Sequence, residues 1–343
     1  MPWPLIGNNT AVRILSRAVD NSSVQHAYVF AGPEQTGRRT AALLLAEALN
    51  CAADARPCGE CTQCRRIAAG NHADIHVVEI EEATDGPAHK EIGVDQLREI
   101  ERAVALNPYE GRTRVVIIDP ANVMSPAAQN AFLKTLEEPP AHVLIVLITS
   151  DESRLLETVR SRCARVPFRL VPVSEIEAAL TNRGTEPERA QLLARLSGGR
   201  PGWAIRAAAD ARFFEARQES LDAARSLPQM PLPDRIELAE KLSESFRQDR
   251  HVVHNRINGW LDWWRDVVLV QSGAGDSVAN SDRIADLGED AGRWPREEVL
   301  AFVRSLIATR EYLAANVQPK IALDALMLDV PGGGMSATPH PSR

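Results

Sequence analysis

The clearest indication of the fold is the segment Gly32-Pro-Glu-Gln-Thr-Gly37-Arg38-Arg39-Thr40. It keeps the frame of the phosphate-binding loop G-x-x-x-x-G-K-[ST], whose backbone N–H groups cradle phosphate. The apolar run Ala27–Phe30 before it predicts a strand, and the leucine- and alanine-rich run Ala41–Leu49 after it predicts a helix. Strand, loop and helix in this order are the context that a phosphate loop requires, so the sequence predicts an α/β domain with a parallel sheet.

Two residues that a working loop needs are replaced. Arg38 stands where the motif has the Lys that reaches the β- and γ-phosphates, and Arg39 stands where it has the Ser or Thr that holds Mg²⁺. A guanidinium has no acceptor and is always charged, so Arg39 would repel the metal. Using Thr40 as the hydroxyl instead would put Arg38 where the tight turn needs Gly. The sequence therefore predicts a phosphate-loop fold that does not hydrolyse ATP.

The predicted strand Arg114–Asp119 supports the same interpretation. It ends in Asp119, the residue type that binds Mg²⁺ at this place in nucleotide-hydrolysing domains. Pro120 follows, so the carboxylate that would activate water is missing. Gln35 is a milder departure, because its Cβ crowds backbone that would otherwise approach phosphate freely.

Alternation of strands and helices continues to about residue 170, and the middle strands are apolar throughout, as buried parallel strands are. Ser125 followed by Pro126 predicts the start of a helix. The further strands are predicted at 75–80, 143–149 and 164–168, and the further helices at 94–105, 126–137 and 152–160.

From about residue 170 the strand signals stop and helices are predicted. Ser174 with Glu177, and Thr185 with Glu188, have the spacing of capping boxes. We expect four parts: an α/β domain at 1–170, a helical lid at 171–207, an all-α domain at 208–330, and a disordered Gly/Ser/Pro tail at 331–343.

Three tryptophans in the all-α part, Trp260, Trp263 and Trp264, could stack on nucleic-acid bases or fill a core. Their helical spacing with Leu261 and Val267 favours the core.

Four of the five cysteines cluster, at Cys51, Cys58, Cys61 and Cys64. Two successive C-x2-C steps with a fourth thiol predict a closed tetrahedral site for structural Zn²⁺ in a reducing compartment. Gly59 allows the turn between the ligands. Free thiols, a disulfide and an iron–sulfur cluster are the alternatives.

The composition is that of a globular protein of 343 residues, with 44% hydrophobic and 25% charged residues. The net charge of -7 argues against a free-standing nucleic-acid binder, which would carry a basic surface. Any DNA contact is therefore expected to be shared with partners. No apolar run reaches the roughly 18 residues that span a bilayer, and the first residues do not resemble a secretory leader. We expect a cytoplasmic protein that does not contact membranes.

Ser161-Arg162-Cys163 follows the helix predicted at 152–160. An Arg that cannot serve its own inactive site can serve the site of a neighbouring subunit, because arginine fingers supplied in trans stabilise the charge of the transferred phosphoryl group. By itself the tripeptide is a weak signal that better fits an Arg bonded to the carbonyl oxygens at the end of a helix.

The motifs taken together resemble those of bacterial clamp-loader subunits, AAA+ proteins that load the sliding clamp for DNA polymerase III. The resemblance covers about residues 3–205, and it matches residues 316–328 in the helical remainder. The motifs that carry it are the run 26–33, the four-cysteine insertion, the run from Asp119 to Asn130-Ala-Phe-Leu-Lys-Thr-Leu-Glu-Glu-Pro-Pro140, and Arg160-Ser-Arg-Cys163.

This resemblance implies roles for individual residues. The four cysteines match the zinc ligands, and Arg162 matches the arginine finger aimed at an adjacent subunit. Gly32, Gly37, Arg38, Arg39, Thr40 and Asp119 lie at the degenerate nucleotide site, where we expect neither ATP nor ADP to bind.

The changed loop is similar to that of the non-hydrolysing delta-prime members rather than the ATP-hydrolysing tau/gamma members. The implied partners are tau/gamma-like and delta-like subunits in a hetero-pentameric ring, the sliding clamp, and primer-template DNA bound through the assembled complex. The protein would then be a non-catalytic part of a DNA polymerase holoenzyme.

Two other functions are open at this point. In one, Arg38 replaces the Lys, Thr40 or water handles Mg²⁺, and the chain hydrolyses ATP itself. In the other, the protein is a zinc-dependent DNA-binding module, which the acidic balance of the chain disfavours.

Overall fold

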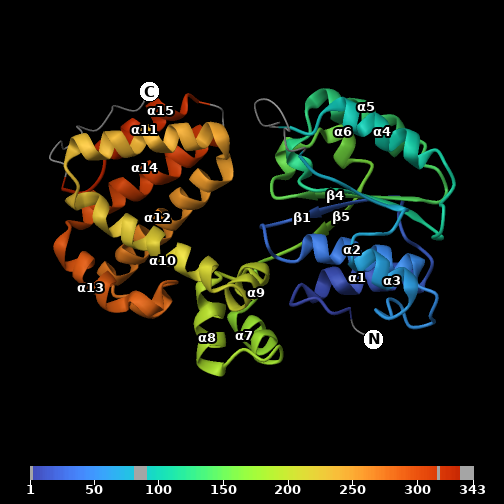
Figure 1. Ribbon diagram of the computed structural model, residues 1–343, viewed down its shortest axis with the longest axis horizontal. Coiled ribbons are helices and arrows are strands. Elements are labelled where there is room, and N and C mark those ends of the chain that lie inside the picture. The colour runs from blue at the N-terminus through green and yellow to red at the C-terminus, as the bar shows by residue number, and fades with distance from the viewer. Residues whose placement is uncertain (1–2, 81–90, 315–316, 333–343) are drawn as a thin grey trace. The chain divides into compact units, whose positions relative to one another are not determined.

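The structure is a computed structural model that describes residues 3–80, 91–314 and 317–332. It divides into two compact units, one of residues 1–185 with 199–205 and the other of residues 186–198 with 206–343. The first unit contains the sheet and the second is helical (Figure 1). The boundaries predicted for an α/β domain, a lid and an all-α domain remain a prediction. The predicted tail 331–343 lies outside the described residues except for 331 and 332, which form a turn.

The sheet of the first unit has five parallel strands in the order β2-β3-β4-β1-β5. Three of them, β1, β3 and β4, are buried along their whole length, which confirms the expectation from their continuous apolar runs. The strands are β1 Ala27–Ala31, β2 Ile75–Val78, β3 Arg114–Ile118, β4 Val143–Thr149 and β5 Ala164–Pro167. The predicted α/β fold with a parallel sheet is therefore confirmed.

Helices cover both faces of this sheet (Figure 1). On one face, side chains such as Phe30 pack with Leu15 of α1 Asn9–Asp20, Leu45 of α2 Arg38–Asn50 and Ile67 of α3 Thr62–Ala68. The other face packs against α4 Val94–Val104, α5 Pro126–Glu137 and α6 Glu157–Arg160. The alternation of side chains along each strand thus supplies two separate cores.

The helix predicted at 152–160 is wrong as a single element. The chain forms a 3-10 turn, η2 Glu152–Arg154, and then the one-turn helix α6. Between them the buried side chain of Gln129 forms hydrogen bonds with the backbone. Its Nε2 donates to the Arg154 carbonyl at 3.1 Å, and its Oε1 accepts from the Leu156 N–H at 2.7 Å. A side chain from α5 therefore replaces the hydrogen bonds that would continue a helix. A further 3-10 turn in the described part of the sheet unit is η1 Ala121–Val123.

Both predicted capping boxes are also wrong. α7 spans Val173–Thr181 with Pro172 at its N-cap, so Ser174 already lies inside the helix. α8 spans Pro187–Leu196 with Glu186 at its N-cap, because Pro187 takes the first helical position. The start predicted at Ser125 is confirmed, since its hydroxyl accepts from the Ala128 N–H at 3.1 Å.

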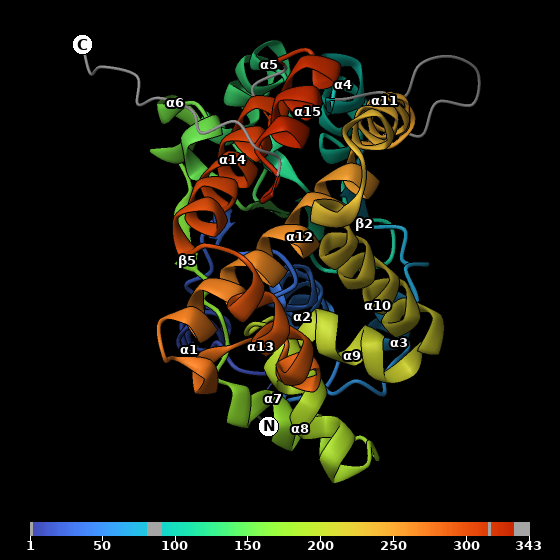
Figure 2. The ribbon, with the colours of Figure 1, turned by 90° about the vertical axis from the view of Figure 1, so that its left-hand side faces the viewer.

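The second unit is an all-α assembly built around one long helix, α12 Arg250–Gln271. Figure 2 shows α12 between α10 Ala211–Ser226 and α14 Arg296–Ala314, which both pack against it. Trp260, Trp263 and Trp264 are fully buried in this core, so the core interpretation of the tryptophans is confirmed. The remaining elements are α9 Pro201–Ala209, which crosses the unit boundary, α11 Leu232–Gln248, α13 Ile284–Arg293, α15 Pro319–Leu328, η3 Leu227–Gln229, η4 Gly275–Ser277 and η5 Ser281–Arg283.

Candidate functional site

The phosphate-loop segment lies between β1 and α2, as the sequence predicts. Gly32 continues from β1 and its N–H donates to the Thr149 carbonyl of β4 at 3.1 Å. A Cβ at Gly32 would lie 2.2 Å from the carbonyl oxygen of Phe168, and a Cβ at Gly37 would lie 2.8 Å from Leu5 Cδ1. Gly37 also has φ 92° as the N-cap of α2, a conformation that favours glycine. Packing therefore requires both glycines, whether or not the loop binds phosphate.

Hydrogen bonds to the backbone carbonyl groups of this loop fix its conformation. The Thr36 hydroxyl donates to the Pro33 carbonyl at 2.7 Å, and the Thr36 carbonyl accepts from Asn8 Nδ2 at 3.1 Å. The backbone carbonyl of Gln35, a residue with φ 59°, accepts from the Gly202 N–H at 3.0 Å. Gln35 thus packs against α9 in a left-handed conformation that non-glycine residues rarely adopt.

Arg38 and Arg39 open α2 and differ in their surroundings. Arg38 is 8% exposed, and its Nη1 has no hydrogen-bond partner among the described residues. Burial lowers the pKa of Arg38, and the nearby charges of Asp119 and Glu34 counteract part of this. Arg39 is exposed and forms an ion pair with Glu79, which follows β2. Thr40 is exposed on the next position of α2.

Asp119 lies directly beyond β3 and faces these arginines. Its N–H donates to the Val78 carbonyl at 3.0 Å, and its Oδ2 lies 3.9 Å from Arg39 Nη1. Burial raises the pKa of Asp119, while Arg39 and Arg38 act in the opposite direction. The structure therefore brings Gly37, Arg38, Arg39 and Asp119 together, but the carboxylate expected to bind Mg²⁺ faces guanidinium groups.

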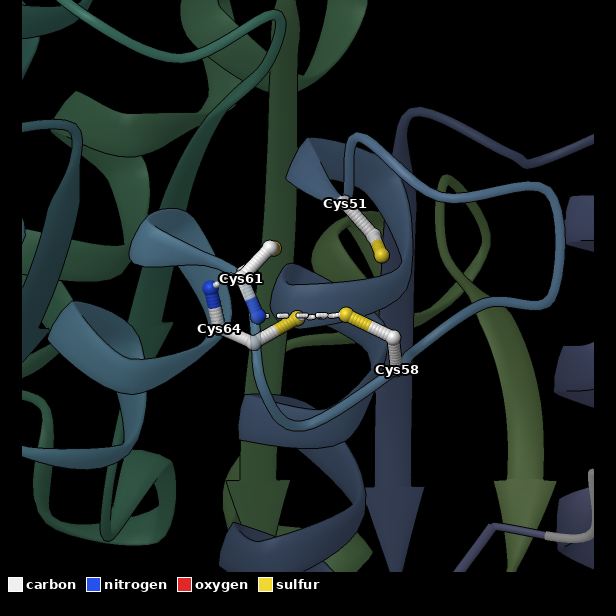
Figure 3. A group of neighbouring side chains, drawn as sticks. All are labelled: Cys51, Cys58, Cys61 and Cys64. Carbon is white, nitrogen blue, oxygen red and sulfur yellow. Dashed lines mark hydrogen bonds between the residues drawn. The ribbon is translucent and has the colours of Figure 1, made fainter.

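The four clustered cysteines converge on one point (Figure 3). Cys51 follows the last residue of α2, Cys61 is the N-cap of α3, and Cys64 lies in the first turn of α3. Their Sγ atoms, with that of Cys58, all lie within 4.8 Å of one another, and Cys58 and Cys64 are 3.9 Å apart. Tetrahedral Zn²⁺ with Zn–S bonds of about 2.3 Å needs sulfur atoms roughly 3.8 Å apart. The cluster therefore fits one tetrahedral metal ion.

Backbone N–H groups lower the pKa of two of these thiols, Cys58 and Cys61. Burial raises the pKa of Cys61, but the N–H groups of Cys64 and Ala52 outweigh this and lower its pKa to about 6. The Cys61 and Glu60 N–H groups lower the pKa of Cys58. Metals bind the thiolate form, so these donors favour the ligand state. Gly59 has φ 73°, which confirms the predicted turn between the ligands.

Two buried polar side chains bind the segment that leads into β3, and sequence reasoning missed both. Asn50, directly before Cys51, accepts from the N–H groups of Arg112 and Thr113 at 2.7 and 3.0 Å. Asp74 accepts three backbone N–H groups from the segment 109–111 at 2.7 to 2.9 Å. An Asn and an Asp between predicted elements gave no signal of these contacts, which join segments about 35 to 63 residues apart.

Arg162 lies beyond the end of α6, in the connection to β5. Its Nη1 donates to the Thr158 carbonyl at 2.8 Å, which is the helix-end contact considered above. Its Nη2 also donates to Glu137 Oε1 at 2.6 Å, and the side chain remains 34% exposed. Glu137 belongs to the Leu-Glu-Glu-Pro-Pro run, which the sequence analysis used only as a motif.

The sheet register places Arg162 and the phosphate loop at opposite edges. Ala164, which begins β5, pairs with Tyr28 near the start of β1, whereas the loop begins at Gly32, after the end of β1. The four residues from Tyr28 to Gly32 correspond to about 13 Å along a strand. Because all strands are parallel, Arg162 lies at the amino edge of the sheet and the loop lies at the carboxyl edge.

None of the helices in the described part of the chain combines the length and apolar character that a membrane crossing needs.

The chain is similar to subunits of bacterial DNA polymerase III. The family model described as DNA polymerase III, delta subunit, matches residues 7–172. DNA polymerase III subunit delta' of Pseudomonas aeruginosa is 32% identical over 325 residues, which cover 90% of this chain and 93% of the relative. The subunit delta' of Bacillus subtilis is 29% identical over 318 residues, which cover 92% and 94%.

A second kind of relative matches a shorter part. DNA polymerase III subunit gamma/tau of Mycobacterium bovis is 38% identical over 178 residues, which are 51% of this chain and 30% of that protein. The similarity to the delta' proteins therefore extends over nearly the whole chain, whereas the similarity to this gamma/tau protein covers about half of it.

Proposed function

Because the chain belongs to the family of DNA polymerase III delta-prime subunits of the clamp loader, we propose that it is a member of the loader ring that does not hydrolyse ATP but donates Arg162 to the ATP bound by a neighbouring subunit. The ring would contain tau/gamma-like and delta-like subunits, and would act on the sliding clamp and primer-template DNA. In this role the chain is a scaffold whose chemistry is performed at the site of another subunit.

One observation carries this proposal: Arg162 lies at the sheet edge opposite its own phosphate loop, with 34% of its side chain exposed. A guanidinium at that edge cannot reach a phosphate in its own loop, because the strand length alone separates them by about 13 Å. A phosphate brought to this edge by another chain would meet it. Stabilising the charge of a transferred phosphoryl group is the known use of an arginine supplied in trans.

The inactive home site supports the same proposal. A hydrolysing site needs Mg²⁺ between a carboxylate and the phosphates. Here Arg39 pairs with Glu79 and lies 3.9 Å from Asp119. A divalent cation at Asp119 would meet this fixed positive charge.

The cysteine cluster adds a structural component. Four thiolates around one Zn²⁺ leave no open coordination position, so the ion would stabilise the module and perform no chemistry. We propose that Cys51, Cys58, Cys61 and Cys64 hold this ion.

The test is ATP hydrolysis by a reconstituted loader that contains Arg162→Ala. We expect a lower rate with clamp and primed DNA, because turnover at the one adjacent site should fall by about 10³-fold or more. Arg160→Ala, which removes a nearby exposed cation, serves as the matched control. An unchanged rate with Arg162→Ala in an intact ring would refute the proposed role.

A further inference from the structure

The side chain of Arg162 is held on two sides by the elements that precede it. Its Nη1 donates to the Thr158 carbonyl at 2.8 Å and lies 3.4 Å from Ser161 Oγ. Its Nη2 donates to Glu137 Oε1 at 2.6 Å. The first two partners belong to the turn that carries Arg162, whereas Glu137 is the last residue of α5 and lies 25 positions away in the sequence.

The backbone on both sides of this contact is fixed by the core. Val159 is 1% exposed and belongs to the core on the α5 side of the sheet, against which Cys163 also packs. α5 contributes Phe132 and Leu136 to the same core. Glu137 therefore projects from a rigid helix end toward a rigid turn, and its distance from Arg162 is set by the packing of α5 against α6.

The ion pair contributes little to stability at this exposed position. The Arg162 side chain is 34% exposed and that of Glu137 is 49% exposed. Pairs of this kind are typically worth between zero and about 1 kcal/mol. The contacts instead set the orientation of the guanidinium, because a free arginine side chain has many rotamers and two anchors on rigid elements select one of them.

The anchored guanidinium of Arg162 retains N–H donors that can bind a further group. A guanidinium carries five N–H groups in one plane. In the described part of the chain, the contacts of Arg162 are those to Thr158, Ser161 and Glu137. They leave the Nε–H and one N–H of Nη2 for an oxygen of a phosphoryl group. Glu137 can therefore remain bonded to Arg162 while Arg162 bonds phosphate.

We infer that Glu137 is the positioning residue for Arg162, and that its carboxylate holds the guanidinium in the orientation in which it meets the γ-phosphate of a neighbouring subunit. This inference rests on the proposed function. Glu137 does not touch the nucleotide, so its removal should lower kcat and leave the KM for ATP unchanged.

The test is a double-mutant cycle in the reconstituted loader with clamp and primed DNA. The Arg162-dependent turnover is the part of the ATP hydrolysis rate that Arg162→Ala removes. We expect Glu137→Ala to lower it about tenfold, since small misplacements of a reacting group reduce the reaction rate strongly. Glu137→Gln keeps an acceptor oxygen and should retain a larger share. Glu138→Ala, the exposed next residue, is the matched control and should match wild type.

The decisive measurement is the effect of Glu137→Ala in the Arg162→Ala background. If Glu137 acts through Arg162, the second substitution adds nothing there, so the two effects are strongly non-additive. Equal loss in both backgrounds would overturn the inference, as would a faster rate with Glu137→Ala, which would mean that Glu137 restrains Arg162.

The cycle separates the failure of this inference from failure of the proposed function. A normal rate with Glu137→Ala, combined with a loss for Arg162→Ala, overturns only the role of Glu137. A normal rate with Arg162→Ala overturns both. Ring assembly, measured by size-exclusion chromatography, must be the same for every variant compared.

Discussion

Arg39 Nη1 lies 3.9 Å from Asp119 Oδ2, so a cation of the protein itself stands beside the carboxylate that a hydrolysing phosphate-loop domain would use for Mg²⁺. Arg39 reaches this place from the first turn of α2, and its ion pair with Glu79 beyond β2 holds it there. The sequence shows that Arg39 replaces the Ser or Thr of the motif, and the structure adds that this replacement places a positive charge beside the retained Asp119.

The first prediction concerns nucleotide binding by the isolated chain. We expect a fluorescent ATP analogue with Mg²⁺ to bind weakly or not at all in an equilibrium titration. Arg39→Thr should increase Mg²⁺-dependent binding, because it removes the positive charge beside Asp119 and restores a hydroxyl at the motif position. Arg98→Thr, which alters an exposed arginine on α4, is the control and should leave binding unchanged.

Thr40 separates this prediction from the alternative in which the chain hydrolyses ATP itself. Thr40→Ala should have no effect if the site is inactive, whereas it should abolish turnover if Thr40 handles Mg²⁺. Brisk Mg²⁺-dependent hydrolysis by the wild-type chain alone would contradict the inactive site.

The second prediction concerns the cysteine cluster. Purified protein should contain one zinc per chain by elemental analysis. Cys61→Ser should lose most of this metal and lower the melting temperature, because metal-binding energy contributes to folding energy. Cys163→Ser is the matched control, since Cys163 lies outside the cluster and should keep the zinc content. Full zinc content in Cys61→Ser would contradict the proposed ligand set.

The third prediction concerns Asp74, whose buried carboxylate accepts three backbone N–H groups and pairs with Arg114 at 2.9 Å. Burial raises the pKa of Asp74, but these donors outweigh it and hold the pKa well below its usual range. Asp74→Asn should cost about 3 kcal/mol of unfolding free energy at pH 7, because Arg114 is left buried without its partner.

The pH dependence of this effect has a definite sign. A carboxyl whose pKa is lowered by folding stabilises the folded state above its unfolded pKa of about 3.9, and the contribution disappears as the pH falls toward the folded pKa. The difference between wild type and Asp74→Asn in urea denaturation should therefore shrink below about pH 4. Asp95→Asn, at a side chain that is 90% exposed, should show no such difference. A difference in unfolding free energy between wild type and Asp74→Asn that stays constant between pH 3 and pH 7 would contradict this prediction.

The fourth prediction concerns Trp263, which is fully buried in α12 and donates its indole N–H to Asp290 at 3.1 Å. Trp263→Ala should destabilise the helical unit by about 3 to 5 kcal/mol, because a large cavity forms and the buried Asp290 loses a donor. Tyr109→Ala, at a residue that is 85% exposed, should change stability by less than about 0.5 kcal/mol. Thermal unfolding measures both, and equal melting temperatures would contradict this role of Trp263.

Much of the fold follows from local sequence. The predicted strand 143–149 agrees with β4 at both ends, and the other four strands begin where predicted and end within two residues of the prediction. Continuous apolar runs define buried strands without reference to the rest of the chain. The cysteine spacing likewise predicts a metal site, because ligands separated by two residues converge in a tight turn.

Local sequence failed where another element supplied hydrogen bonds or fixed a boundary. The segment 152–160 has the composition of one helix, but Gln129 of α5 binds its backbone and divides it. No sequence pattern within those nine residues could predict hydrogen bonds from a side chain about 25 positions away.

A parallel α/β sheet, a four-cysteine module and a phosphate loop without its Lys and Ser or Thr could all be predicted from the sequence, since each depends on residue types at short, fixed spacings. The folded chain was needed to show that Arg39 faces Asp119, that Glu137 pairs with Arg162, and that Arg162 and the loop lie at opposite edges of the sheet. These relations depend on strand order and helix packing, which bring together residues far apart in the chain.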